Sequence, residues 1–182
     1  AGIQTLYVRD ASGNVMAVYA NGRSSNVMML RELHMYGSSR LGIVSQEGSN
    51  GLLVTYTEVD LHIDYGKAKV HTFERTRKLF ELSNHLGNVL TTITDRRHQV
   101  DEDEDDVVDY YTTDVASAAD YYPFGSTLPG RSYNSESMRH GFNGQMKSPE
   151  VGADHYTALY WEYSAPLGRR WNVDPKPNAS IS

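Results

Sequence analysis

One short motif occurs twice in this 182-residue chain, and it restricts the folds that the chain can adopt. Residues 10–15 read Asp-Ala-Ser-Gly-Asn-Val, and residues 84–89 read Asn-His-Leu-Gly-Asn-Val. An Asp or Asn side chain can accept hydrogen bonds from the backbone that follows it, and glycine adopts a positive φ without steric cost. Short apolar segments flank both copies. The motif therefore predicts two β-hairpins, with arms at residues 5–8 and 15–19 and at residues 78–82 and 89–94.

The remaining patterns also favour strands. Residues 58–63 alternate polar and apolar side chains, which is the period of a half-buried strand. Residues 27–36 are the best helix candidate, but glycine and serines end the segment, so we prefer a strand there. Residues 138–142 and 155–163 predict further strands, while residues 126–137 predict an irregular segment. The 13 tyrosines and 15 glycines suit strands and turns, so we expect an all-β array of antiparallel β-hairpins.

A run of six acidic residues, 101–106, interrupts this pattern. Like charges at this density repel one another, so residues 95–109 are predicted to form an acidic inserted loop. The loop separates β-hairpin strands in residues 1–94 from a second segment, residues 110–182.

The acidic run also has part of the spacing of a calcium loop. Asp101, Asp103 and Asp105 stand at positions 1, 3 and 5 of an EF-hand, but Asp106 replaces the glycine of position 6 and Thr112 the glutamate of position 12. A solvated loop is therefore favoured over a specific calcium site.

Composition excludes several functional classes. The chain has no cysteine, and therefore no disulfide, thiol nucleophile or cysteine metal site. A net charge of −6 argues against nucleic acid as a partner, and no apolar run is long enough for membrane insertion. Among the histidines, His62 and His71 could meet across a hairpin as half of a metal site, but surface or packing roles are favoured. We expect no metal and no other cofactor.

The tyrosines allow an alternative function. Aromatic side chains recur from Tyr56 to Tyr163 and could stack on a glycan, as they would in a β-structured surface adhesin. Because the arginines and lysines are scattered rather than interleaved with them, stacking between tyrosines on paired strands is the favoured interpretation.

The most concentrated chemistry lies in residues 167–175, Leu-Gly-Arg-Arg-Trp-Asn-Val-Asp-Pro. In a strand, Arg170, Asn172 and Asp174 would share one face. An arginine beside an aspartate lowers the pKa of that carboxyl, and a second carboxylate there would share a proton, as acid proteolysis requires. From spacing alone, an ordinary ion pair is the favoured interpretation.

Taken in order, these motifs resemble the bacterial Rhs family. The spacing of Tyr7, Asp10, Gly13 and Asn14 is similar to the tyrosine–aspartate (YD) repeat of that family. Three later segments resemble successive landmarks of its repeat-associated core domain: residues 82–89 with Asn84, Gly87 and Asn88, residues 120–125 with Tyr122, Pro123 and Gly125, and residues 141–144. Residues 167–175 resemble its closing signature.

The resemblance implies a structural function. Rhs proteins wind β-hairpins into a spiralling hollow shell that encloses a C-terminal toxin or other cargo, and the core domain forms a plug-like, irregular C-terminal end. By this resemblance, the chain is a shell and plug segment of an exported protein, secreted or at the cell surface, that acts in bacterial competition. Its implied partners are the rest of its parent chain or neighbouring shell strands, the cargo and a secretion machinery, with no nucleic acid and no membrane insertion.

The resemblance also implies an enzymatic alternative, an aspartyl autoprotease that releases the cargo. Asp174 matches the first catalytic aspartate, and Arg170 (or Arg169) matches the basic residue before it. The family places a second Asp-Pro motif further along, and this sequence ends at Ser182 before such a motif occurs. We therefore expect half of an active site, no self-cleavage by this chain alone, and a chain that is part of a larger protein.

Overall fold

The computed structural model describes residues 3–21, 28–46, 56–62, 66–71, 75–158 and 161–172, and it describes only the backbone of residues 56–71. The described chain is all-β, which confirms the fold class predicted from the sequence. Its helical segments are two single 3-10 turns, Ser135–Ser137 and Phe142–Gly144. No helix in this part of the chain is long and apolar enough to cross a membrane.

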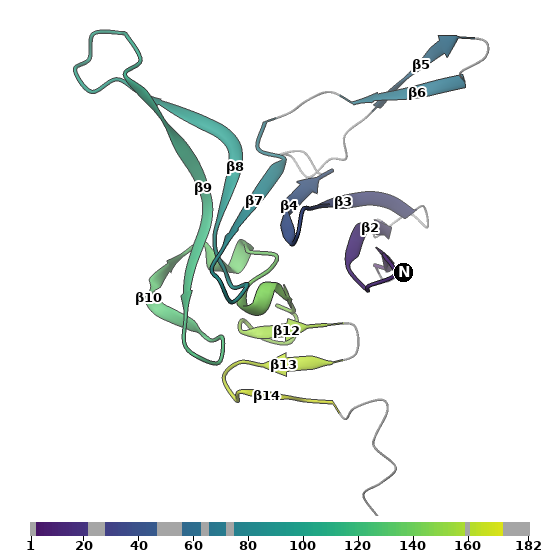
Figure 1. The fold of residues 1–182 in the computed structure, drawn as a ribbon, viewed down its shortest axis with the longest axis vertical. Coiled ribbons are helices and arrows are strands. Elements are labelled where there is room, and N and C mark those ends of the chain that lie inside the picture. The colour runs from purple at the N-terminus through teal and green to yellow at the C-terminus, as the bar shows by residue number, and fades with distance from the viewer. Residues whose placement is uncertain are drawn as a thin grey trace, which may run out of the picture. The chain divides into compact units, whose positions relative to one another are not determined.

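The main element is an eight-stranded sheet in which consecutive hairpins lie side by side (Figure 1). Its strand order is β1-β2-β3-β4-β7-β8-β9-β10. The strands are β1 (Thr5–Arg9), β2 (Val15–Asn21), β3 (Met28–Tyr36), β4 (Arg40–Ser45), β7 (Lys78–Ser83), β8 (Val89–Val100), β9 (Tyr110–Tyr121) and β10 (Thr127–Tyr133). A separate antiparallel hairpin, β5 (Tyr56–His62) and β6 (Gly66–His71), lies between β4 and β7 in the sequence. This arrangement is the predicted array of antiparallel hairpins.

A small antiparallel sheet follows in the last part of the chain. It has the order β11-β12-β13-β14. Its strands are β11 (Met146–Lys147), β12 (His155–Thr157), β13 (Glu162–Ser164) and β14 (Arg169–Arg170). The chain divides into two compact units, one of Ala1–Phe80 with Thr94–Asp114 and the other of Glu81–Ile93 with Val115–Ser182.

In the first unit, buried residues lie on both faces of the sheet, since Ala17 and Val18 are consecutive and both buried. Val18 and Ile43 are each only 3% exposed, and Ile43 pairs with the buried His34 across β3 and β4. On the opposite face, β1 to β4 align Val8, Ala17, Leu33 and Val44 in one row. In this row Ala17 is buried, whereas Val8 and Leu33 are exposed, so the face is covered only in part.

In the second unit, the hydrophobic core is small. Val89, Ala119 and Met138 are buried together, and Tyr121 packs against them. Val89 is the first residue of β8 and Ala119 lies near the end of β9, so the core forms where these two long strands are anchored.

Strands β8 and β9 continue from this core as a long two-stranded ribbon that carries the acidic loop (Figure 1). β8 extends to Val100, whereas the sequence analysis began the loop at residue 95. The loop itself is therefore Asp101–Asp109. Residues 95–100 mix both charge signs and pair as a strand, and the chain leaves the sheet where the acidic run begins.

Two local predictions were wrong. Residues 138–142 do not form a strand but make an isolated bridge between His140 and Met146, because the 3-10 turn at Phe142 ends the extended backbone. Residues 126–137, predicted to be irregular, include strand β10. β10 lies at the end of the sheet and its side chains from Pro129 to Tyr133 are exposed, so polar residues suit it.

Candidate functional site

The two copies of the sequence motif fold into the same turn. In the first, the Asp10 N–H donates to the Asn14 carbonyl over 3.0 Å, and the Gly13 N–H donates to the Asp10 carbonyl over 3.1 Å. In the second, the Asn84 N–H donates to the Asn88 carbonyl over 3.0 Å, and the Gly87 N–H donates to the Asn84 carbonyl over 2.9 Å. The glycines have φ values of 89° and 82°. This pattern is the three-residue hairpin loop that ends in a left-handed glycine.

The first side chain of each turn caps it in the same way. Asp10 Oδ1 accepts the N–H groups of Ser12 and Asn14, each over 2.8 Å, and Asn84 Oδ1 accepts those of Leu86 and Asn88, each over 3.0 Å. Asp10 Oδ2 also accepts the Asn14 side-chain amide over 2.9 Å.

These bonds favour the charged form of Asp10. The Asn14 side-chain amide and the Asn14 backbone N–H, together with weaker backbone donors, lower the pKa of this exposed carboxyl. Tyr7, the other residue of the YD spacing, lies in β1 opposite Val18, with the Arg9 guanidinium 5.6 Å from its ring centre.

Two further turns share these backbone bonds, although the sequence analysis did not group them with the first two. In one, the Tyr122 N–H donates to Ser126 and the Gly125 N–H to Tyr122, each over 2.8 Å. In the other, the Gly141 N–H donates to the Gln145 carbonyl and the Gly144 N–H donates to the Gly141 carbonyl, each over 3.0 Å. Neither begins with Asp or Asn, so a search for the side-chain cap misses them. Their common signal is a glycine three residues after the first residue, at φ 92° and 65°.

Within the second unit, the turn of Asn84–Asn88 is bonded to the turn of Gly141–Gln145. The Asn88 side-chain oxygen accepts the Asn143 N–H over 2.8 Å, and the Val89 N–H donates to the Gly141 carbonyl over 3.0 Å. The Tyr121 hydroxyl donates to the Val89 carbonyl over 2.9 Å. Asn88 is buried, so its side chain supplies an acceptor that the neighbouring turn needs.

The Phe142 ring forms the centre of the same region. The rings of Tyr121, Tyr156 and Tyr163 each lie with their centroids 6.3 Å from that of Phe142. Such separations are typical of stabilising aromatic pairs. We refer to the three turns at residues 84–88, 122–126 and 141–145, with these four aromatic side chains, as the turn cluster.

Two tyrosine hydroxyls of the turn cluster donate hydrogen bonds to the turn at residues 122–126. Tyr156 donates to the Gly125 carbonyl over 3.0 Å, and Tyr163 donates to the Phe124 carbonyl over 2.9 Å. Burial raises the pKa of the Tyr121 and Tyr156 hydroxyls, which keeps them protonated as donors. Tyr122 and Pro123, at the exposed tip of this turn, take no part in these bonds. The buried tyrosines therefore make structural contacts with Phe142 and with turn carbonyls, whereas the sequence analysis expected tyrosines to stack on one another across paired strands.

A buried acid–base pair crosses the second unit beside the cluster. His140 Nδ1 lies 2.8 Å from Glu81 Oε1, and the two side chains are only 4% and 5% exposed. Glu81 lies in β7, and His140 directly precedes the turn at residues 141–145. The contact joins residues 59 positions apart, which is why neither was singled out from the sequence.

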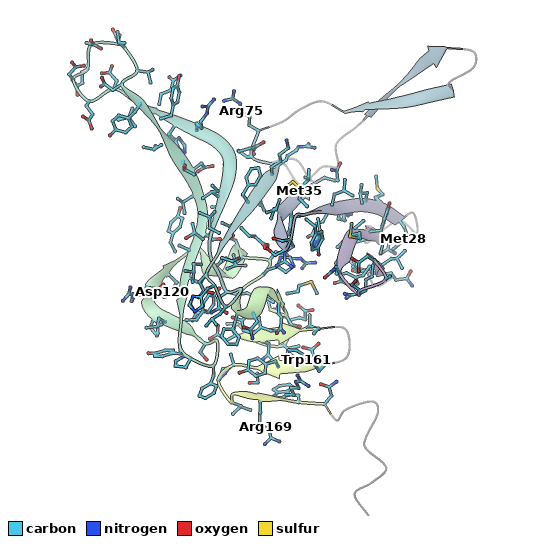
Figure 2. All side chains as sticks on the ribbon, viewed as in Figure 1. Met28, Met35, Arg75, Asp120, Trp161 and Arg169 are labelled. Atoms are coloured by element: carbon cyan, nitrogen blue, oxygen red, sulfur yellow. The ribbon has the colours of Figure 1, made fainter. Side chains whose placement is uncertain are left out.

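The residues of the closing segment are only partly described. Arg170 lies in β14 opposite Tyr163, and its guanidinium lies 4.6 Å from the centre of the Trp161 ring (Figure 2 labels Trp161 and Arg169). Arg169 pairs with Ser164 and is exposed. Asp174 lies outside the described residues. The described contact of Arg170 is thus a cation–π interaction that holds the edge of the small sheet.

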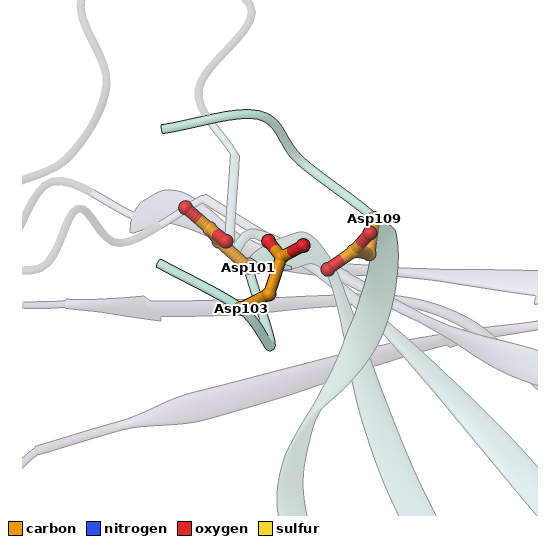
Figure 3. Close-up of side chains that lie close together, drawn as sticks. All are labelled: Asp101, Asp103 and Asp109. Carbon is orange, nitrogen blue, oxygen red and sulfur yellow. The ribbon is translucent and has the colours of Figure 1, made fainter. Parts of the chain in front are cut away.

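The acidic loop brings together Asp101, Asp103 and Asp109 (Figure 3). One carboxylate oxygen of each lies within 4.8 Å of the others. Asp105, which the EF-hand spacing would require, is not a member of this group. Asp101 instead accepts the backbone N–H of Asp106 over 2.9 Å, and Asp109 accepts that of Glu102 over 2.8 Å. These carboxylates close the loop on itself.

The possible half of a metal site at His62 and His71 is not assembled. In the β5–β6 hairpin, His62 pairs with Gly66 near the turn, whereas His71 pairs with Tyr56 at the far end. The register therefore separates the two histidines along the strands.

The chemistry of the described residues is that of a structural junction. The turn cluster joins three segments of the chain. Each segment contributes a turn, and backbone groups of that turn are hydrogen-bonded to another segment. Comparison of the chain with protein-family models, curated proteins and solved structures gives no match.

Gly125 provides a test of the turn cluster. A Cβ atom at Gly125 would lie 2.5 Å from Phe142 Cγ, whereas one at Gly130, which also has a positive φ, has no neighbour within 4 Å. We expect Gly130→Ala to cost about 1 kcal/mol from its left-handed backbone, and Gly125→Ala to cost about 1–3 kcal/mol more from overpacking. Chemical denaturation measures both, and equal losses would contradict the packing of Gly125 against Phe142.

Asp10 and Asn84 predict hairpins of different acid sensitivity. Because hydrogen bonds lower the pKa of Asp10 in the folded chain, its carboxylate stabilises the fold above the ordinary Asp pKa of about 3.9, and this contribution is lost as the pH falls through the lower folded pKa. Asp10→Asn should remove this dependence, since Asn84 caps its turn without a charge. The difference in unfolding free energy between the two proteins should shrink toward zero or reverse on acidification, and a constant difference would contradict the assignment.

The buried pair of Glu81 and His140 predicts a large loss of stability when its carboxylate is replaced. Glu81→Gln leaves His140 without its carboxylate in a buried site, and removing one partner of such a pair costs about 3 kcal/mol or more. Glu150 is exposed, and Glu150→Gln is the matched control with little expected change. Urea unfolding of both variants measures the losses. Similar stability of the two would show that the pair is not buried as described.

Proposed function

We propose that the chain is a structural segment of an Rhs-type β-shell, in which a hairpin sheet forms wall and the C-terminal residues form a plug over an enclosed cargo polypeptide. The supporting observation is the turn cluster. The three segments whose sequences resemble successive Rhs core landmarks are the same three whose turns pack on one another around Phe142. Residues that share a family pattern are expected to share a structural task, and here that task is to hold the second unit together.

The main sheet supports a wall function. Its hairpins follow one another in chain order, so the wall extends by adding hairpins at an edge rather than by enlarging a central core. The turns at residues 10–14, 84–88 and 122–126 are three-residue loops that end in a left-handed glycine, and such loops close with a bulge that increases the local twist. A twisted sheet of repeated hairpins curves, and curvature is what a closed wall requires.

The second unit supports a plug function. Its small sheet is connected by irregular segments, and the buried Tyr156 of that sheet donates to the Gly125 carbonyl between β9 and β10. The end of the wall sheet and the small sheet are thereby fixed to one another within one compact unit. Self-cleavage depends on Asp174, which lies outside the described residues, so the structural role is the one we propose.

The proposal is tested on the intact polypeptide that contains this sequence, isolated from its source. We expect a hollow particle in electron micrographs and a polypeptide segment inside it that resists added protease. Gly125→Ala, which disrupts the turn cluster, should make that segment digestible, and the control Gly130→Ala should leave it protected.

The mass of the same material decides between the outcomes. An intact mass of 20.4 kDa, together with a single-chain particle that protects no other polypeptide, would contradict the shell function. Equal protection in the two glycine variants would contradict the part assigned to the turn cluster.

A further inference from the structure

One face of the small sheet carries a buried histidine with an unpartnered ring nitrogen. His155, in β12, is only 7% exposed, and its Nε2 atom forms no hydrogen bond with any described residue. Gly152 packs beside the ring, because a Cβ atom there would lie 3.0 Å from His155 Nδ1. Buried polar atoms in proteins nearly always have a hydrogen-bond partner, so an exception needs an explanation.

The His155 ring contacts the Trp171 ring instead. The two ring centroids lie 4.3 Å apart at an interplanar angle of 71°, so the rings meet edge to face. Trp171 directly follows β14 and is 55% exposed, and its N–H donates to the Glu162 carbonyl over 2.9 Å. The imidazole of β12 therefore reaches across β13, and this ring contact helps to hold Trp171 on the sheet.

A second unpartnered atom lies on the same face. His155 stands opposite Ser164 across β12 and β13, and Glu162 lies two residues before Ser164, so the three side chains share one face. The Glu162 Oε2 atom is buried and has no hydrogen-bond partner within the described chain. Diagonal neighbours in a sheet lie within reach of each other when their side chains are long. Glu162 is therefore an acceptor that the His155 ring can reach by moving.

The other charged groups around this face are exposed, bonded elsewhere or on the opposite face. Arg169 of β14 shares the face but is exposed, whereas Lys147 of β11 lies on the opposite face. In the loop before β12, Glu150 is exposed, and Asp154 Oδ1 accepts a threonine hydroxyl of β10 over 2.8 Å. Among the described residues, Glu162 is thus the carboxylate available to a protonated ring at this site.

We propose that His155 is an acid-sensitive latch, whose ring exchanges Trp171 for Glu162 when it is protonated. Histidine is the side chain that ordinarily gains its charge in the mildly acidic range. A buried charge without a hydrogen-bonded partner is far more costly than a buried neutral ring, and contact with one aromatic ring offsets only part of that cost. Because Nε2 does not bond Glu162 in the present packing, the ring has to leave Trp171 in order to reach the carboxylate.

The expected consequence is a local release at the end of the small sheet. Strand β14 has only two residues, so the ring contact of Trp171 is a large part of what holds this end in place. The tyrosine hydroxyls that bond the turn cluster lie on the opposite face and keep their protons in acid. The inference does not depend on the proposed shell, because all of these contacts lie within the small sheet and its adjoining loop.

The first test follows Trp171 in a Trp161→Phe chain, where it is the only tryptophan. On acidification from about pH 8 to about pH 5, we expect its fluorescence to shift to longer wavelength and its quenching by acrylamide to increase. His155→Gln should abolish both changes. His85 is exposed, so His85→Gln is the matched control and should retain them. Far-ultraviolet circular dichroism at each pH establishes that the chains stay folded.

The second test concerns the acceptor. In Glu162→Gln the protonated ring has no carboxylate to pair with, so the midpoint of the fluorescence transition should move to lower pH by about one unit or more. Glu150→Gln removes an exposed carboxylate from the same unit and should leave the midpoint unchanged.

Nuclear Overhauser effects in the unmodified chain test the exchange even if a variant fails to fold. Cross-peaks between the ring protons of His155 and Trp171 should be strong at about pH 8 and lost at about pH 5. Fluorescence of Trp171 that does not change in acid, or that changes equally in a folded His155→Gln chain, would overturn the latch. Cross-peaks that persist after the histidine has titrated would overturn the release, and a midpoint unaffected by Glu162→Gln would overturn the exchange of partners.

Discussion

The structure depends on a glycine that adopts a left-handed backbone three residues after the first residue of a turn. With this glycine, three residues suffice to reverse the chain, and the two flanking strands keep the right-handed twist that pairing requires. The bond from the Gly N–H back to the first carbonyl recurs at Gly13, Gly87, Gly125 and Gly144. A side chain at that position would strain the turn, so these four reversals of the chain lie where the glycines stand.

Three of these turns lie in the second unit, where their tips are exposed but some of their backbone groups are bonded by neighbouring segments. Backbone N–H and C=O groups at a turn normally bind water, and burying them requires other partners. The partners here are side chains of the adjacent segments, namely the Asn88 amide oxygen and the hydroxyls of Tyr156 and Tyr163. This use explains the choice of tyrosine, because phenylalanine would fill the same volume but leave the carbonyls of residues 124 and 125 without a donor.

The sequence was sufficient wherever the cause of a structure is local. Asp10 and Asn84 cap turns with their own side chains, alternation marks strand β5, and the acidic run leaves the sheet by its own repulsion. It was insufficient where the cause lies far along the chain. Residues 138–142 look like a strand, yet the turn at Phe142 and the contact of His140 with Glu81 decide their backbone. The turn cluster could not be derived for the same reason, since it joins residues from β7 to β13.

The repeated hairpin also shows how one local design serves two positions in a sheet. The same turn follows β1 and β7, but among the described residues β7 has a partner strand on both sides and β1 on one side. The turn is the same in both places because its hydrogen bonds lie within the turn itself. A hairpin can therefore stand inside the array or at its end without a change in its turn motif. Particular residues of an edge strand then determine whether another strand can pair with it. At β10, Pro129 and Gly130 interrupt the strand, and its register with β9 shifts between Thr127 and Ser132.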